Sequence, residues 1–273
     1  MIQDKAMMAR LTISQWTGRK TDKKVTDEVE KAHGAKDAGN FRKLLVDKSL
    51  LDPIAKIAGA TREYHYHVTL AWSDNGDRVL PSALFLNYTQ QTRKFKSDFE
   101  AAVQVFKTKY PTEVQAARQR LGTMYDPGDY PSVDEIVQKF SITTEFNPIP
   151  SANDFRVEVD SDARESIQAD IEAKVVERQA QAVKATLARV KDVVEKMYEK
   201  LSDDKAVFRD SLVTNVSDLR EILIGLNITN NGLINELAVD LKALDEPPEG
   251  LRRSTALRAK VAQKAFAILQ KLP

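Results

Sequence analysis

Three histidines, His33, His65 and His67, are the side chains of this sequence that best suit a metal ion. The pair His65-x-His67 lies in residues 64–72, where apolar and polar residues alternate, and this period of two predicts a short extended segment. On a strand both imidazoles would share one face, an arrangement that metal sites use. Because no further ligand follows at a known spacing, a structural strand is the favoured interpretation, and we predict no metal and no other cofactor.

Acidic residues gather after residue 122. Asp126, Asp129, Asp134 and Glu135 would suit Mg²⁺ in a nuclease-like site, although such a run is more commonly a solvated surface. The sequence contains no Walker A motif, no Gly-x-Gly-x-x-Gly, no Gly-x-Ser-x-Gly and no His-Glu-x-x-His. We therefore predict no catalytic residues and interpret the chain as a protein that is not an enzyme.

Basic side chains suggest a third kind of chemistry, contact with nucleic acid. In residues 78–96 cations alternate with aromatic rings, the mixture that binds the phosphates and bases of single strands. The segment 249–273 is also basic. The alternative interpretation assigns the rings to a helix core and the last cations to an ordinary solvated face. The predicted nucleic-acid-binding residues are Arg78, Arg93, Lys94, Lys96, Arg252, Arg253, Arg258, Lys260 and Lys264.

Composition limits the class of protein and its location. With 41 Lys or Arg and 40 Asp or Glu, the net charge of +1 exerts no global attraction on nucleic acid or membranes. Charge is divided along the chain instead, because residues 1–24 and 249–273 are basic and residues 123–170 are acidic. The sequence has no cysteine, no signal-like apolar start and no run of about 18 apolar residues. We expect a cytoplasmic protein without membrane contact.

Only ten glycines and ten prolines occur in 273 residues, which favours long helices over many tight turns. Apolar spacing predicts helix over residues 41–60, divided at Asp52-Pro53. A second helix is predicted over residues 82–110, and a short one from Pro111 to Leu121. These helices are expected to bury the aromatic residues of the central region.

Shorter signals follow these helices. Ser132 and Glu135 have the spacing of a capping box, which predicts the start of a helix. Residues 141–146 and 155–159 both look strand-like, and we predict that they pair as a small hairpin.

The strongest pattern lies in residues 161–201, where apolar residues recur at steps of four and three. Such an a/d seam predicts one helix on the order of 60 Å long that needs a helical partner. Residues 208–226 are the predicted antiparallel partner but reach only about half as far. We therefore predict that the last helix, residues 249–272, or a second copy of the chain covers the rest. The seam consists of Ala169, Ala173, Val176, Ala180, Val183, Leu187, Val190, Val194, Met197 and Leu201.

Together these segments predict a mainly α fold of long antiparallel helices, a coiled-coil-like hairpin, with a small β insertion. The predicted division places a helical region with short β segments in residues 1–160 and a long-helix bundle in residues 161–273. One continuous elongated domain is the alternative.

Short motifs spread over nearly the whole chain carry a resemblance. They are Thr61-Arg62, Thr69-Leu70, Trp72, Asp74, Gly76, Arg78, Leu80-Pro81, Tyr130-Pro131, Asp154-Phe155-Arg156-Val157, Phe208-Arg209-Asp210-Ser211-Leu212 and Leu226-Asn227. In these motifs the chain resembles an uncharacterised bacteriophage protein family. Ile13-Ser14, Trp16 and Gly18-Arg19-Lys20 also resemble a domain of unknown function from phages and mobile elements. The resemblance implies a setting near replication and recombination genes, sometimes beside MoxR-type ATPases, and no residue roles.

Two classes of function follow. The first is a non-enzymatic phage protein of DNA transactions, which binds single-stranded DNA or a replication or recombination partner. The second is a structural or adaptor protein, for example an accessory of a MoxR-type AAA+ ATPase, which contacts protein partners through its long helices. A homo-oligomer is compatible with both classes.

Overall fold

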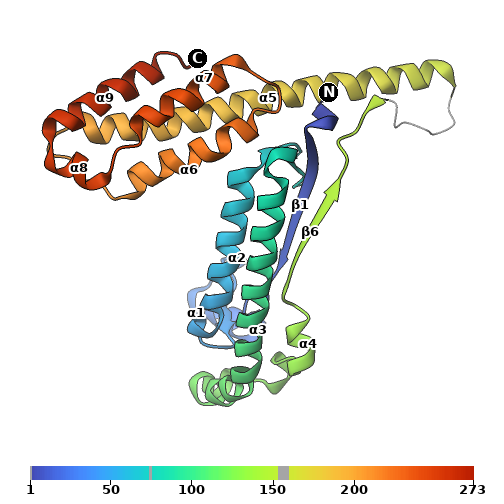
Figure 1. The fold of residues 1–273 in the computed structure, drawn as a ribbon. Coiled ribbons are helices and arrows are strands. Elements are labelled where there is room, and N and C mark those ends of the chain that lie inside the picture. The colour runs from blue at the N-terminus through green and yellow to red at the C-terminus, as the bar shows by residue number, and fades with distance from the viewer. Residues whose placement is uncertain (1, 74–75, 153–159) are drawn as a thin grey trace. The chain divides into compact units, whose positions relative to one another are not determined.

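The computed structural model describes residues 2–73, 76–152 and 160–273, which are mainly helical with a small β component, as predicted (Figure 1). No helix in these ranges has the length and apolar composition that a membrane span requires. The helices are α1 (Lys23–His33), α2 (Lys48–Val68), α3 (Phe85–Leu121), α4 (Val133–Val137), α5 (Ser161–Ser202), α6 (Ser211–Leu226), α7 (Gly232–Leu241), α8 (Pro248–Arg253) and α9 (Thr255–Leu269). The strands are β1 (Ala6–Ser14), β2 (Arg19–Thr21), β3 (Arg42–Leu44), β4 (Leu70–Ala71), β5 (Arg78–Pro81) and β6 (Ser141–Asn147).

The strands form one four-stranded sheet and one two-stranded ribbon. The sheet has the order β4-β5-β1-β6, and β5 is antiparallel to both β4 and β1. The ribbon pairs β2 with β3 in antiparallel register. The predicted strand over 141–146 is confirmed as β6, whereas its predicted partner, 155–159, lies outside the described residues.

The chain divides into two compact units. The ribbon unit comprises residues 11–65 and 89–144, and the bundle unit comprises residues 1–10, 66–88 and 145–273. The prediction that residues 1–160 and 161–273 form separate domains stays a prediction.

Aromatic rings fill the core of the ribbon unit. Phe99, Phe106 and Phe140 are buried, and the ring of Phe140 makes edge-on contacts with those of Phe99 and Phe106, with centroids 6.4 and 5.2 Å apart. Pro111 lies inside α3, so the predicted break in this helix is wrong. Ala117 and Leu121 continue the buried face of Tyr110 past the proline, and we attribute the unbroken helix to this packing, which compensates for the lost backbone hydrogen bond.

The bundle unit is built around α5, whose C-terminal half packs against α6, α7 and α9. The predicted long helix over 161–201 is confirmed as α5, Ser161–Ser202. The predicted single helix 249–272 is two helices, because the Ser254 side chain accepts a hydrogen bond from the N–H of Leu257, 3.1 Å away, and begins α9 there.

The a/d seam of α5 is buried along only part of its length. Leu187, Val190 and the later seam residues belong to the bundle core, to which α9 also contributes. The last helix leaves the earlier part of the seam exposed, so the prediction that it covers the rest of the seam is wrong, and cover by a second copy stays a prediction. Among the earlier seam residues, Ala169, Ala173, Val176 and Ala180 are exposed, and Val176 keeps 65% of its surface accessible, whereas Val183 is partly buried against the bundle core. The coiled-coil pairing of this earlier part therefore stays a prediction.

Three sequence-based assignments near α2 are wrong. The predicted division at Asp52-Pro53 is not present, because Pro53 lies inside the continuous helix α2. Residues 64–68 are helical, not extended, because a buried face with helical spacing (Ile54, Ala58, Thr61, His65 and Val68) continues through them. Residues 42–44 form β3, not helix, and α2 begins only at Lys48.

Candidate nucleic-acid interface

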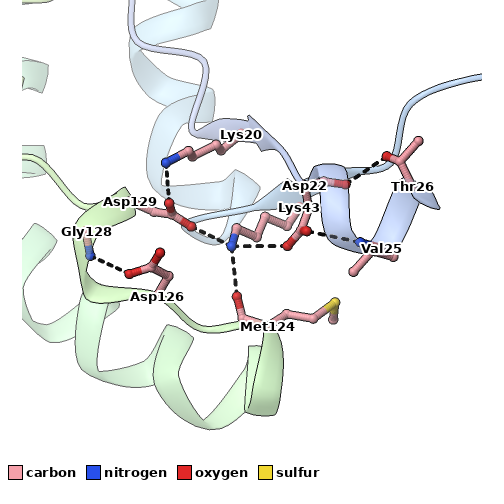
Figure 2. Close-up of polar contacts among 9 residues, drawn as sticks. All are labelled: Lys20, Asp22, Val25, Thr26, Lys43, Met124, Asp126, Gly128 and Asp129. Carbon is pink, nitrogen blue, oxygen red and sulfur yellow. Dashed lines mark hydrogen bonds and ion pairs between the residues drawn. The ribbon is translucent and has the colours of Figure 1, made fainter. Parts of the chain in front are cut away.

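A buried ion cluster fixes one face of the β2–β3 ribbon (Figure 2). The ammonium group of Lys43 lies 2.5 Å from Asp129 Oδ2 and 3.3 Å from Asp22 Oδ2, and it donates to the carbonyl of Met124 at 2.9 Å. Lys20, on β2, pairs with the other carboxylate oxygen of Asp129. The side chain of Asp129 is 2% exposed, so this carboxylate depends on the two lysines for its charge compensation.

The segment that carries Asp129 is itself well ordered by local contacts. Asp126 accepts a hydrogen bond from the N–H of Gly128 at 2.9 Å, and the hydroxyl of Tyr130 donates to the carbonyl of Leu45 at 3.0 Å. The hydroxyl of Tyr110 donates to the carbonyl of Pro131 at 3.1 Å. These bonds tie the segment to α3 on one side and to the residue after β3 on the other.

The charges of the cluster support one another. Burial alone would raise the pKa of the Asp129 carboxyl, but the bonds from Lys20 and Lys43 outweigh it and lower this pKa. Burial alone would lower the pKa of Lys43, but Asp129 and Asp22 raise it. Asp22, the N-cap of α1, has a lowered pKa, first because it accepts from the N–H of Val25. Asp129, Lys43 and Asp22 are therefore charged at neutral pH.

Acid is expected to remove the stabilisation that Asp129 provides. Because its pKa is lower in the folded than in the unfolded chain, its contribution is complete above the unfolded value of about 3.9 and disappears as the pH falls through the folded value. Asp129→Asn should cost about 3 kcal/mol at pH 7, and the gap to the wild type should narrow below about pH 4. Thermal melts of both proteins across this range check the prediction, which a constant gap would contradict.

The opposite face of the ribbon lines a cleft of about 740 Å³. Side chains alternate along a strand, so Arg19 and Thr21 of β2 share a face with their partners Leu44 and Arg42 of β3. All four of these residues line the cleft, whereas Lys20 and Lys43 point to the ion cluster. Because side chains alternate along both strands, Lys20 and Lys43 lie in the ion cluster on one face of the ribbon, and Arg19 and Arg42 lie at the cleft on the other face.

Four cations surround this cleft: Arg19, Arg42, Lys48 and Arg62. All four are exposed, and none has an ion pair or a side-chain hydrogen bond with any residue that the structure describes. Asp52 is the acidic residue in the lining. The cleft therefore has a surplus of positive charge, and an anionic ligand would relieve the repulsion among its cations.

The remaining wall of the cleft is apolar. Trp16 lies there, supported edge-on by Phe106 and Tyr110 with centroids 6.1 and 5.9 Å away. Gly18 has a left-handed backbone (φ +65°), and a Cβ atom on it would lie 2.8 Å from Leu51 Cδ1. Glycine is therefore required at this position for the chain to turn from Trp16 into β2. The apolar lining residues are Ile13, Trp16, Leu44, Val46, Leu51, Ile54, Ala55 and Phe140.

Two of the predicted nucleic-acid-binding residues make contacts that stabilise the fold. Arg258 is 7% exposed, so the expectation that it is a free surface cation is wrong. Arg78 donates to Thr69 Oγ1 at 2.6 Å and lies over the ring of Tyr66, 4.7 Å from its centroid. The guanidinium of Arg258 donates to the carbonyls of Lys200 (2.8 Å), Asp203 (2.5 Å), Asp204 (3.2 Å) and Ala206 (3.0 Å), the segment where α5 ends.

The other predicted cations are spread over both units. In the bundle unit, Arg252 pairs with Asp210, Arg253 with Glu249 at 3.4 Å, and Lys264 donates to the carbonyl of Ala243. Lys260 is exposed on α9. In the ribbon unit, Arg93, Lys94 and Lys96 are exposed on α3, and none of them lines the cleft.

The predicted alternatives for metal binding are not supported. His65 is buried in α2, where residues two apart point in different directions, so His65 and His67 do not share a face. Asp134 and Glu135 lie at the start of α4, where the predicted capping box of Ser132 and Glu135 is confirmed. Within the described ranges no three His, Cys, Asp or Glu side chains group as metal ligands.

Sequence reasoning missed the four cations of the cleft, although two signals point to one of them, Arg19. Residues 1–24 are basic, and Gly18-Arg19-Lys20 is one of the motifs of the resemblance. The sequence gives no sign that β2 pairs with β3, because its apolar spacing predicts a helix from residue 41. Only this pairing brings Arg42 beside Thr21 and Arg19.

Comparison of the chain with protein-family models, with curated proteins and with solved structures finds no match. The resemblance to a bacteriophage family therefore stays a prediction.

Proposed function

We propose that the protein binds single-stranded DNA without acting as an enzyme, and that the cationic cleft of the ribbon unit is the binding surface. The observation that supports this most strongly is the group of four cations without ion-pair partners in the described structure, set beside an apolar wall. Phosphates would contact Arg19, Arg42, Lys48 and Arg62, which neutralises charge on both sides. This proposal keeps the predicted function but moves it to other residues.

The apolar wall favours a single strand over a duplex. A duplex hides the flat faces of its bases, whereas a single strand exposes them for stacking on rings such as Trp16. The cleft volume of about 740 Å³ is in the usual range of ligand sites, so it would admit a short part of the strand. If the phage resemblance is correct, this binding would serve replication or recombination in the host cytoplasm.

The wild-type protein is expected to bind a short fluorescein-labelled single-stranded oligonucleotide with strong salt dependence. Four phosphate contacts predict a log–log slope of affinity against salt of about −2.8. Fluorescence anisotropy between about 0.05 and 0.3 M salt measures this slope. If no binding appears at the lowest salt, the nucleic-acid function is wrong.

Tryptophan fluorescence can place the DNA in the cleft. The chain has two tryptophans, Trp16 in the cleft wall and Trp72 in the bundle unit. In a Trp72→Phe background the emission comes from Trp16, and a stacked base should quench it. Binding by anisotropy without any change in Trp16 emission would place the DNA elsewhere.

A second candidate function, an adaptor, is favoured by the exposed part of the α5 seam. Ala169, Ala173, Val176 and Ala180 follow the heptad spacing and are all exposed. A helix of a partner protein, of a MoxR-type ATPase or of a second copy would complete the seam as a coiled coil. Light scattering of the protein alone, and with such an ATPase, tests this function.

A further inference from the structure

The β2–β3 ribbon needs support from outside its own strands. It contains three residue pairs, and an isolated two-stranded ribbon of this size is at best marginally stable in water. Two of its six residues, Arg19 and Arg42, belong to the proposed binding surface. Their placement therefore depends on whatever holds the ribbon in position.

The support comes from the segment between α3 and α4. Asp129 binds β2 through Lys20 and β3 through Lys43, so a single carboxylate bridges both strands (Figure 2). Tyr130 adds a second tie through its bond to the carbonyl of Leu45, directly after β3. The Asp129 tie lies on the side of the ribbon opposite the cleft-lining side chains, because Lys20 and Lys43 alternate with them along the two strands.

We propose that Asp129 is a positioning residue for DNA binding, which fixes both strands of the ribbon so that Arg19 and Arg42 stand ordered at the cleft. This inference rests on the proposed function. Without Asp129, Lys20 loses its partner and Lys43 keeps only Asp22 and the Met124 carbonyl. The two arginines would then have to be ordered when DNA binds, which costs affinity.

Whether Asp129→Asn weakens or strengthens DNA binding distinguishes a positioning role of Asp129 from a purely electrostatic effect. Asp129→Asn removes a negative charge near a cationic cleft, so electrostatics alone predicts tighter binding to DNA. Positioning predicts weaker binding, by about three- to tenfold. Asp126→Asn is the matched control, since it removes the same charge from the same segment and keeps an oxygen for the N–H of Gly128. Its affinity should equal or exceed that of the wild type.

Amide hydrogen exchange of the ribbon tests the structural step without DNA. The backbone amides of residues 19–21 and 42–44 should exchange faster in Asp129→Asn than in the wild type and in Asp126→Asn. Tyr130→Phe is a milder variant that loses its bond to Leu45 with no change of charge. It should loosen the same amides to a smaller extent, and it keeps the test possible if Asp129→Asn does not fold.

The outcomes are distinct. Faster ribbon exchange together with weaker DNA binding supports the inference. Unchanged exchange in Asp129→Asn and Tyr130→Phe overturns it, and so does faster exchange with equal or tighter binding. If the wild type binds no single-stranded DNA, the proposed function fails, while the exchange data still decide whether Asp129 holds the ribbon.

Discussion

Replacing Arg19 and Arg42 together by glutamine is expected to weaken binding to single-stranded DNA about 25-fold at 0.1 M salt. Each phosphate contact contributes about 0.7 to the salt slope, so two lost contacts flatten the slope by about 1.4. If the two proteins bind equally at 1 M salt, where the electrostatic contribution vanishes, a slope difference of about 1.4 over the tenfold decrease to 0.1 M salt gives a loss of affinity of about 25-fold. Both residues are exposed and have no ion pair in the described ranges, so we expect the variant to keep its fold.

The matched control removes two cations that the sequence predicted as DNA contacts. Arg253 and Lys260 lie exposed on the bundle unit, outside the cleft. Arg253→Gln with Lys260→Gln changes the net charge by the same amount, and its salt slope should match that of the wild type. If this control flattens the slope and the Arg19/Arg42 variant does not, the α8–α9 surface binds the DNA and the cleft does not.

Much of the helical fold could be predicted because its signals are local and repeat along the chain. The spacing of Leu187, Val190, Val194 and Met197 defines one face of a long helix, and the structure buries these four residues. The capping box of Ser132 is also a local signal, complete within four residues. Such features follow from the sequence because the pattern that defines them lies within one helix.

The errors arose where a distant contact decides the local structure. The alternation in residues 64–72 suggested a strand, but the buried positions of α2 begin ten residues earlier and continue to Val68. Lys43 looks like one more solvated cation in a polar stretch. It is buried because Asp129, 86 positions further along, supplies its counter-charge. Single-sequence periodicity contains no information on such a pair.

The candidate site was missed for the same reason. Its cations come from β2, β3 and α2, and their common cleft exists only when these elements are assembled. Conversely, Arg258 follows the pattern of an exposed basic helix, yet carbonyls from the end of α5 surround its guanidinium. Charge counts identify basic segments, and only the fold shows which cations remain available to a ligand.

The two halves of the α5 seam are expected to respond very differently to a buried charge. Val190→Asp places a carboxylate among core residues that are almost fully inaccessible, and it should cost about 4–5 kcal/mol. Val176→Asp makes the same chemical change in the same helix at a residue that is 65% exposed. Because valine and aspartate have similar helix propensities, this control should change stability by no more than about 0.5 kcal/mol.

Denaturant unfolding, followed by circular dichroism and by tryptophan emission in a Trp16→Phe background, measures both effects. In that background the emission comes from Trp72, which belongs to the same unit as α5. A large shift of the midpoint for Val190→Asp alone would agree with the burial that α6, α7 and α9 provide. A comparable loss in Val176→Asp would mean that the earlier seam is also covered in solution, and a second copy would then be the first partner to test. If that loss grew as the protein was diluted, the cover would be intermolecular, because dissociation depends on protein concentration and packing within one chain does not.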